Sequence, residues 1–563
     1  MRLIKFSWFL FFLLLLGCSR PASSAGLREN STTENNVTSI IFEGLTAQVS
    51  GTGAVFLDRT LTIREPGTYV LSGILENGQV HINAGRDDAV SLVLNGVSLH
   101  NETGPAIFSQ RSRETIIVLE EGTHNTISDS ARQTDSDERN AAIYVQNNLH
   151  LTGEGSLSVI GNYRHGIRAQ DILTITGGSI TVDSTGHSLL GRNGVIIDGG
   201  NFTFNAGADG IQSSRTTGDD VGFITISGGD FNIHAQNDGI QAESTLTITG
   251  GVFHIVTGGG SASVPVRQSN FNRGWGGRPG PAIQTADDSV SMKGLKAGKQ
   301  VIIMGGDFII DTEDDGVHSD GDILITSGRL QIKTGDDGIH ADGAVVISGG
   351  DIDIPVCYEG IEGLSVTISG GNISIISTND ALNAASPDDT PNMGWGRRQL
   401  NENIFVRITG GTVDLHAFAD GIDSNGNIFI EGGMLMISGP SMIMEGAVDF
   451  DGAFVITGGE LITAGSILGI SQGTTQPVIL VSYTRQQASG SVIAIKDQNE
   501  NTLLEYTSKT AFSYSGFTSP HFSIGETYSL FINGEKRTDI RLNNIGTGIS
   551  DTGGTYNQGR GRW

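Results

Sequence analysis

Short runs in which apolar and polar residues alternate fill most of the chain. Residues 345–354 hold two such runs, Val-Val-Ile-Ser and Asp-Ile-Asp-Ile, on either side of a glycine pair. A period of two and a high share of β-branched residues are typical of short β-strands with one buried face. The gaps between the runs leave no room for crossover helices, which excludes a sheet built from βαβ units. The pattern therefore predicts an all-β protein.

The glycine pair recurs along the chain, and its short spacings are 21 to 23 residues. Each unit runs strand, glycine turn, strand, acidic turn, and the longer spacings contain insertions. Glycine permits a positive φ in a tight corner. A unit of about 22 residues suits one coil of a parallel β-helix, whose coils stack about 4.8 Å apart. The repeats are Gly177-Gly178, Gly199-Gly200, Gly228-Gly229, Gly250-Gly251, Gly305-Gly306, Gly349-Gly350, Gly370-Gly371, Gly410-Gly411, Gly432-Gly433 and Gly458-Gly459, and Gly328-Arg329 fills one further position.

Three other repeat folds fit this pattern less well. The glycine-rich calcium-binding roll has a nine-residue period, leucine-rich repeats need a leucine framework, and propeller blades need about 40 residues each. The first two features are absent from the sequence, and the unit is too short for the third. The repeat therefore favours a parallel β-helix.

The first 17 residues are typical of a signal peptide. Arg2 and Lys5 precede an apolar run at 6–16 that is short for a membrane span. The run ends in Leu-Leu-Gly followed by Cys18, which resembles the lipobox of bacterial lipoproteins and implies acylation of Cys18. We expect an exported protein, lipid-anchored to the bacterial membrane and exposed at the cell surface or in the periplasm. The alternative is ordinary secretion, with Cys18 incidental.

Changes in the alternation of apolar and polar residues and in composition divide the rest of the chain into five segments. The predicted segments are a lipidated tether (18–37), an N-terminal cap with irregular coils (38–140), the parallel β-helix (141–473), a small C-terminal β domain or cap (474–545) and a disordered glycine-rich tail (546–563).

The charge of the chain narrows the choice of partners. The formal charge is −27, and removal of Arg2 and Lys5 with the signal peptide would make it −29. Such a surface repels nucleic acid and anionic lipid and attracts divalent cations. Cys18 and Cys357 are the only cysteines, so a lipid on Cys18 would preclude an intramolecular disulfide. We expect a monomer that meets the membrane only through its lipid anchor.

Five successive coils align as a polar corner with two columns. Steps of 22, 22, 22 and 21 residues place equivalent residues over one another. The apolar residue between the columns should point inward, and alternation then turns the second column outward. The glycine after the first column resets the backbone, so the facing of that column stays open. The first column is Lys293, Asp315, Asp337, Glu359 and Asp380, and the second is Lys296, His318, His340, Glu362 and Asn383.

Stacked carboxylates in this corner predict a cation. Like charges one coil apart repel and raise each other's pKa, and Lys293 lies at one end only. Ca²⁺ is a hard ion that takes six to eight oxygens. In the alternative, these residues make turn hydrogen bonds to the backbone; zinc is disfavoured because no Cys or His cluster completes a tetrahedral set. The candidate Ca²⁺ ligands are Asp314, Asp315, Asp320, Asp336, Asp337, Asp342, Glu359 and Asp380.

Two long insertions flank the corner and share the motif Asn-x-Gly-Trp-Gly-x-Arg. One carries Trp275 and Arg278, and the other carries Trp395 and Arg398. Four coils, or about 19 Å, separate them. Tryptophan can stack on a sugar ring and arginine can pair with a uronate, although the tryptophans could instead anchor the loops. The candidate carbohydrate-binding residues are Trp275, Arg278, Lys296, His318, His340, Glu362, Trp395 and Arg398.

These features together resemble a known family. The repeat Asp-Gly-Ile-His-Ala-Asp at 337–342 is followed by Ile-Ser-Gly-Gly at 347–350, and Lys-Gly-Leu-Lys-Ala at 293–297 is a variant. Over residues of about 50 to 545 the chain is similar to the lipoprotein-type carbohydrate-binding family with a pectate-lyase-like β-helix. The resemblance implies a right-handed parallel β-helix that binds Ca²⁺ and polysaccharide, of the cellulose or polygalacturonate class. It does not imply lyase activity, and Asp380-Ala381-Leu382 departs from the family's Asp-Gly-Ile form.

Three functions remain for comparison with the structure. We expect a non-catalytic, calcium-dependent protein that binds plant-type or acidic polysaccharide at the cell surface. The first alternative is a pectate-type polysaccharide lyase, which needs Ca²⁺ on the uronate and a Lys or Arg base; Lys293 or Lys296 would serve. The second alternative is a surface adhesin or structural rod, because one fold hosts all three functions.

Overall fold

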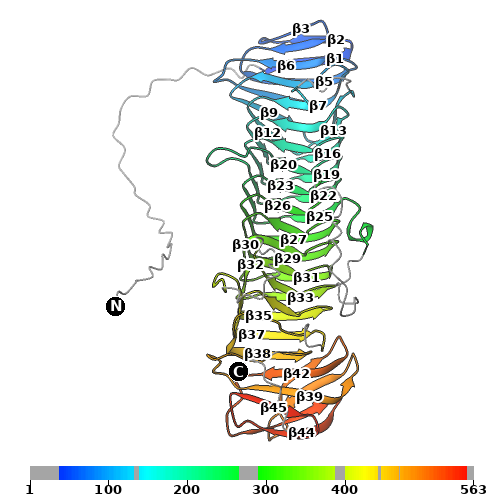
Figure 1. Ribbon diagram of the computed structural model, residues 1–563. Helices are drawn as coiled ribbons and strands as arrows, with labels where there is room; N and C mark the ends of the chain where they lie inside the picture. The colour runs from blue at the N-terminus through cyan, green and yellow to red at the C-terminus, as the bar shows by residue number, and fades with distance from the viewer. Residues whose placement is uncertain are drawn as a thin grey trace, which may run out of the picture.

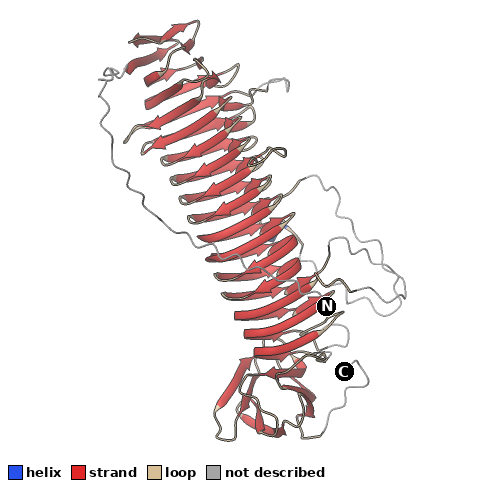
Figure 2. Ribbon diagram, turned by 90° about the vertical axis from the view of Figure 1, so that its left-hand side faces the viewer, coloured by secondary structure: helices blue, strands red, loops and turns tan. Residues whose placement is uncertain are grey.

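The computed structural model describes residues 37–131, 138–265, 290–386, 400–441, 446–467 and 469–554 (Figure 1). The prediction of an all-β protein is confirmed, since the one helical element of the described residues is a single 3-10 turn, η1 (Ser261–Ser263). The strands stack as rungs along one long axis (Figure 2). Among the described residues, no helix has the length and apolar character needed to cross a membrane.

Three columns of parallel strands run along this axis, and the chain visits each column once per coil. In the regular region the residues that stack are Val317, Ile339 and Ile361, which repeats the 22-residue unit of the sequence. The column that carries the polar corner consists of β4 (Thr60–Ile63), β6 (Gln79–Asn83), β8 (Ile107–Arg111), β11 (Ala141–Val145), β14 (His165–Ala169), β17 (Leu189–Gly191), β20 (Ile211–Ser213), β23 (Ile240–Ala242), β26 (Leu295–Ala297), β28 (Val317–Ser319), the first parts of β30 (Ile339–Ile347) and β32 (Ile361–Ile368), β34 (Leu382–Ala384) and β36 (Ile422–Ser424).

The other two columns lie on either side of the glycine turn, and long strands contribute to both. The second column comprises β9 (Glu114–Leu119), β12 (Asn148–Gly153), β15 (Ile172–Ile175), β18 (Gly194–Ile197), β21 (Phe223–Ile226), β24 (Thr245–Ile248) and the second parts of β30 and β32. The third column comprises β10 (His124–Asp129), β13 (Ser156–Gly161), β16 (Ser179–Ser184), β19 (Asn201–Ala206), β22 (Asp230–Ala235), β25 (Val252–Thr257), β31 (Asp351–Cys357) and β33 (Asn372–Ser377). Strands shared by both are β5 (Gly67–Leu75), β7 (Ala89–Asn101), β27 (Gln300–Thr312), β29 (Asp322–Thr334), β35 (Phe405–Ala417), β37 (Asn427–Ser438) and β38 (Phe454–Ala464).

The glycine turn needs its two residues for different reasons. In Gly349-Gly350, a Cβ on Gly349 would lie 2.4 Å from the carbonyl oxygen of Thr326 in the preceding coil, whereas Gly350 has a φ of 105°. The first glycine therefore allows close stacking and the second allows a left-handed backbone. Gly328 has a φ of 110° and takes the second place of its pair, so Ser327 rather than Gly328 occupies the first.

The interior of the stack is an apolar column. Phe202, Phe231, Phe253 and Phe308 stack in turn with ring centroids 4.6, 4.7 and 4.6 Å apart. These distances match the spacing of adjacent strands, so each ring packs on the equivalent ring of the next coil. This buried column holds the coils in register and leaves the corner residues at a defined position on its rim.

Antiparallel strands occur at both ends of the stack. At the N-terminal end β1 (Val37–Gly44) pairs with β2 (Thr46–Ser50), and β3 (Ala54–Leu57) pairs with β4. At the C-terminal end β38 pairs with β42 (Phe512–Thr518), which also pairs with β39 (Val478–Gln487). A separate sheet contains β40 (Val492–Lys496), β41 (Thr502–Thr507), β43 (Thr527–Ile532) and β44 (Glu535–Arg541).

One predicted boundary is wrong. The glycine-rich tail was expected to be disordered from residue 546, but β45 (Gly546–Ser550) is a strand that pairs in parallel with β39. The backbone hydrogen bonds of a sheet do not need apolar side chains, so composition alone missed this strand.

Candidate functional site

The first column of the polar corner extends beyond the five aligned coils, through the related corners that the sequence also shows at Asp209, Asp238 and Asp420. The strand register continues it on both sides of Lys293 and Asp380. The full column is His165, His187, Asp209, Asp238, Lys293, Asp315, Asp337, Glu359, Asp380 and Asp420. The apolar residues beside it, such as Val317 and Ile339, are fully buried, in agreement with the predicted alternation.

Side chains of this column accept hydrogen bonds from the backbone of the next coil. The N–H of Asp337 donates to Oδ1 of Asp315 at 3.1 Å, and the N–H of Glu359 donates to Oδ1 of Asp337 at 3.2 Å. The N–H of Asp420 donates to Oδ1 of Asp380 at 2.7 Å. The carboxylates of the first column are therefore buried and face the backbone. Hydrogen bonding to the backbone, the alternative to metal binding, is present, and it links successive coils rather than residues of one turn.

The remaining oxygen of Asp315 contacts Lys293 and His318. Nζ of Lys293 lies 2.6 Å from Oδ2 of Asp315 and 3.0 Å from Oδ2 of Asp314. His318 contacts the same Oδ2 of Asp315 through Nδ1 at 2.9 Å. Burial would raise the pKa of Asp315, but the hydrogen bond from His318 and the charge of Lys293 lower it well below its usual value. Asp315 is therefore an ion-paired carboxylate.

The second column supplies the histidines that balance the next carboxylates. The rings of His318 and His340 stack with centroids 5.1 Å apart. Nδ1 of His340 lies 3.0 Å from Asp337 and 3.4 Å from Glu362. Burial alone would lower the pKa of His340, but these two carboxylates raise it to about 11. The pKa of Asp337 is raised as well, first by burial, so the pair of Asp337 and His340 holds a proton at neutral pH.

The outer carboxylates predicted as metal ligands contact the histidines. Asp320 lies 3.1 Å from Nε2 of His318, and Asp342 lies 3.6 Å from Nε2 of His340. Asp314, Asp315 and Asp336 bring one oxygen each within 4.8 Å of one another. The coils of Asp315 and Asp337 thus contain many carboxylates. Lys293 and His318 hold the pKa of Asp315 low, whereas burial and the charges of Asp315 and Glu359 raise the pKa of Asp337 well above its usual value despite its hydrogen bond with His340.

The base required by the lyase alternative is also engaged. Burial would lower the pKa of Lys293, but Asp315 and Asp314 raise it above its usual value, so the amine is protonated. Nζ of Lys296 donates to Oγ of Ser291 at 3.1 Å and lies 3.6 Å from Asp238. Neither lysine stands free as a proton acceptor.

Carboxylates gather without such cations at the C-terminal end of the corner. Among the described residues, Glu359, Asp380, Asp423 and Asp449 form no ion pair with Lys, Arg or His. We call these four residues, together with Asp420 and Asp451, the acidic end. Sequence reasoning missed Asp423, Asp449 and Asp451, although the segment Asp-Gly-Ile-Asp at 420–423 repeats the corner motif and was the available signal.

Burial and mutual repulsion raise the pKa values at the acidic end. Burial, followed by the charges of Glu359, Asp423 and Asp420, raises the pKa of Asp380 to about 9. Burial and Asp449 raise the pKa of Asp423 to about 7. Burial, with the charge of Glu362, also raises the pKa of Glu359 to about 7. These carboxylates lack positive charge rather than hydrogen bonds.

Asn383 lies among these carboxylates and is buried, although alternation placed it outward. Its Nδ2 donates to Oε2 of Glu359 at 2.8 Å, while its Oδ1 is buried without a hydrogen-bond partner. An unpaired buried carbonyl is costly, and carbonyl and carboxylate oxygens are the ligands that Ca²⁺ prefers. The donor set of the acidic end therefore fits Ca²⁺.

Several predicted residues lie outside the described residues. They are Cys18, Trp275, Arg278, Trp395 and Arg398. The segments that carry the two tryptophans join the corner column, since one ends before β26 and the other begins after β34.

The described chain is thus an all-β stack of coils with a line of buried polar side chains along one corner. It belongs to the family of carbohydrate-binding domain-containing proteins, which matches residues 57–338 and 336–527. A carbohydrate-binding domain-containing protein from Acetivibrio thermocellus is 32% identical over 129 residues. The match covers 22% of this chain and spans less than half, 45%, of the length of that relative.

A solved structure is also similar to part of the chain. It is the gadolinium derivative of the polysaccharide lyase-like protein from C. thermocellum, with 30% sequence identity and a TM-score of 0.38. The similarity covers 39% of this chain and 92% of that chain.

Proposed function

We propose that this protein is a non-catalytic, calcium-dependent polysaccharide-binding protein, exported and held at the membrane by a lipid on Cys18. Its coil is a right-handed parallel β-helix, and its ligands are acidic or plant-type glycans of the polygalacturonate or cellulose class. Membership of the carbohydrate-binding family supports a polysaccharide ligand.

The acidic end supports the requirement for calcium, and the unpaired Oδ1 of Asn383 carries the argument. Asn383 lies in the second column between Glu362 and Asp423, and its Nδ2 donates to Glu359; burial raises the pKa values of Glu359 and Asp423 to about 7. Glu359, Asp380, Asn383 and Asp423 would hold the ion. The bound ion would supply the positive charge that an acidic chain needs to recruit an acidic glycan.

The state of Lys293 favours binding over lyase chemistry. A lyase base must accept a proton from the sugar, whereas Lys293 is protonated and contacts two carboxylates. A structural rod or adhesin would need neither the raised pKa values nor the unpaired amide oxygen of the acidic end.

Calorimetric titration with Ca²⁺ tests this proposal. The wild type should bind Ca²⁺, and Asp380→Asn with Asp423→Asn should weaken binding at least tenfold. Asp230→Asn is the matched control, because Asp230 is an exposed carboxylate on β22 in another column. Affinity electrophoresis on polygalacturonate should show clearly stronger retardation with Ca²⁺ than with EDTA. Retardation that is equal in EDTA, or Ca²⁺ affinity that is unchanged in the double variant, would contradict the proposal.

A further inference from the structure

A second polar hollow lies on the corner column, several coils before the acidic end. It encloses about 480 Å³, and its lining includes Arg164, Arg168, Arg192, Asn140 and Tyr163. Three arginines converge there in a chain that has 61 acidic residues against 34 Lys and Arg. We call this hollow the arginine pocket.

Arg168 is the inner wall of the arginine pocket. One of its terminal nitrogens donates to Oδ1 of Asn140 at 2.5 Å, and the guanidinium lies 5.6 Å from the centre of the Tyr144 ring. Its Nε is buried and has no hydrogen-bond partner. A guanidinium carries five donors in a planar fork, so Arg168 keeps donors that the described protein does not use.

The other two arginines form the rim. Arg164 precedes His165 at the start of β14, and Arg192 follows β17 one coil later; both are exposed. Among the described residues, neither Arg164 nor Arg192 forms an ion pair with a carboxylate, and Glu138 is the one acidic residue of the lining. Burial lowers the pKa of Arg168, and the charges of Arg164 and Arg192 add to this effect. The three positive charges therefore repel one another, and an anion would relieve the repulsion.

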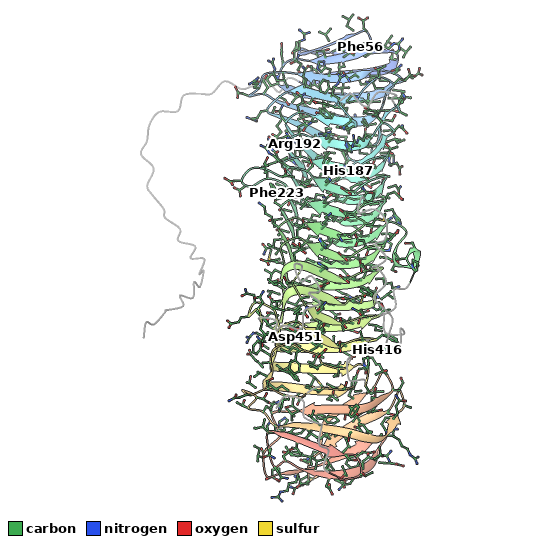
Figure 3. All side chains as sticks on the ribbon, in the orientation of Figure 1. Phe56, His187, Arg192, Phe223, His416 and Asp451 are labelled. Carbon is green, nitrogen blue, oxygen red and sulfur yellow. The ribbon has the colours of Figure 1, made fainter. Side chains whose placement is uncertain are left out.

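The arginine pocket lies in line with the acidic end, eight coils or about 38 Å before Asn383 in the second column. Arg168 belongs to the second column of the corner, four coils before Lys296, or about 19 Å along the axis. The intervening residues of that column are Leu190, Gln212 and Gln241, which are uncharged. In Figure 3, Arg192 and Asp451 are labelled on the same side of the stack, toward its N-terminal and C-terminal ends. An extended glycan that follows the corner would meet both.

We propose that the arginine pocket binds the carboxylate of a uronate residue in a saccharide, without a metal ion. The proposal rests on the proposed function for the class of ligand and assigns it a second contact. Guanidinium groups pair with planar carboxylates through two parallel hydrogen bonds, and the exposed guanidinium groups of Arg164 and Arg192, with Arg168 behind them, suit this geometry. The amide of Asn140 and the ring of Tyr163 provide a polar and an aromatic neighbour for the sugar.

Calorimetry with trigalacturonate in excess EDTA tests the arginine pocket separately from the calcium site. The wild type should bind, and the double variant Arg164→Gln/Arg192→Gln should weaken binding at least tenfold. Both side chains are exposed, so the double variant should fold, which circular dichroism checks. Arg168→Lys keeps the charge and removes the fork, and it should also weaken binding several-fold. Arg215→Gln is the matched control; Arg215 lies nearby, where it donates to Asn193 at 3.0 Å, but it is not in the lining.

Two comparison ligands identify the chemistry. Cellotriose, which is neutral, should not bind in EDTA, and a sulfated trisaccharide should bind more weakly than trigalacturonate. The proposal is overturned if trigalacturonate does not bind in EDTA, if the double variant binds as the wild type does, or if the sulfated ligand binds more tightly. If one of these results is obtained while calcium-dependent retardation on polygalacturonate persists, only the proposal for the arginine pocket is refuted. Loss of retardation by the wild type would refute the proposed function itself.

Discussion

The coils around Asp315 and the coils of the acidic end share one backbone register but differ in charge. Around Asp315, Lys293, His318 and His340 contact the carboxylates. At the acidic end, burial and neighbouring carboxylates raise the pKa values of Asp380 and Asp423. Backbone N–H groups oppose this rise, and no cationic side chain of the described residues does so. The same stacking geometry therefore accommodates both arrangements.

The N-terminal coils show that the fold does not need carboxylates in the first column. The N–H of His187 donates to Nδ1 of His165 at 3.1 Å, and the N–H of Asp209 donates to Nδ1 of His187 at 3.1 Å. Burial lowers the pKa of His165 to about 2, so its ring is neutral and can accept. Where Lys293 cannot accept, Asp314 takes the N–H of Asp315 at 3.0 Å. Any acceptor satisfies the backbone, so the gathering of carboxylates at the acidic end has another cause, and cation binding is the cause we propose.

The largest expected effect is loss of an ion pair in the neutralised coils. Asp315→Asn leaves Lys293 with Asp314 alone and should destabilise the fold by about 3 kcal/mol, because a buried pair loses one partner. The amide oxygen can still accept from Asp337, so the backbone contact survives. Urea unfolding in EDTA and in Ca²⁺ measures this change, which should be similar under both conditions. A variant as stable as the wild type would mean that the ion pair of Asp315 with Lys293 does not stabilise the fold.

Calcium should stabilise the folded protein through the acidic end and not through the coils around Asp315. At 100 times its Kd, Ca²⁺ should raise the free energy of unfolding by about 2.7 kcal/mol, because it binds only the folded state. In Asp423→Asn the increase should be much smaller, whereas Asp230→Asn should behave as the wild type. Melting curves measure this stabilisation. If the wild-type curves in EDTA and in Ca²⁺ coincide, the acidic end does not differ from the coils around Asp315 in its response to calcium.

The pH dependence of stability should also follow the acidic end. The folded pKa values of Glu359, Asp380 and Asp423 are raised to about 7, 9 and 7, above the usual value for carboxyls of about 4. The folded state therefore holds more protons than the unfolded state, and stability in EDTA should fall as pH rises from about 4 to about 9. Each proton involved contributes a slope of up to about 1.4 kcal/mol per pH unit.

Asp380→Asn and added Ca²⁺ should each flatten this loss of stability. Denaturant unfolding at several pH values gives the slope, with Asp230→Asn as the control. A wild-type stability in EDTA that rises between pH 5 and 9 would be the opposite of this expectation.

A smaller effect is expected from the insertions that flank the corner. Trp275→Ala or Trp395→Ala should weaken glycan binding by about 1 to 2 kcal/mol if each ring stacks on a sugar. The two effects should add, because distant sites act independently. Calorimetry on soluble polygalacturonate and a cellulose pull-down provide the measurement. Unchanged binding by a folded double variant would assign the tryptophans to loop anchoring.

No effect is expected in the assay for lyase activity. Incubation of the wild type with polygalacturonate and Ca²⁺ should release no unsaturated product that absorbs in the ultraviolet, because Lys293 is protonated. An enzyme-dependent rise in absorbance would contradict the conclusion that the corner lacks a catalytic base. Lys293→Ala and Lys296→Ala would then show which lysine is the base.

Part of the corner was predictable because equivalent residues of successive coils are separated by an almost constant number of residues. The alignment of Asp315, Asp337 and Glu359 follows from a 22-residue repeat, and the burial of Val317 and Ile339 follows from alternation. The pairing of His318 with both Asp315 and Asp320 did not follow, because it depends on the rotation of the ring between the two columns.

The sequence by itself determined the all-β class, the coil length and the identity of the inward residues, since these depend on local alternation and on glycine at each turn. The tertiary structure decided which polar residues meet across irregular spacings. His165 and His187 joined the column, and Asp449 came to lie beside Asp423, through the strand register. The three arginines of the arginine pocket likewise come from two successive coils. Insertions change the count of residues between coils without changing their stacking, so only the paired strands reveal these neighbours.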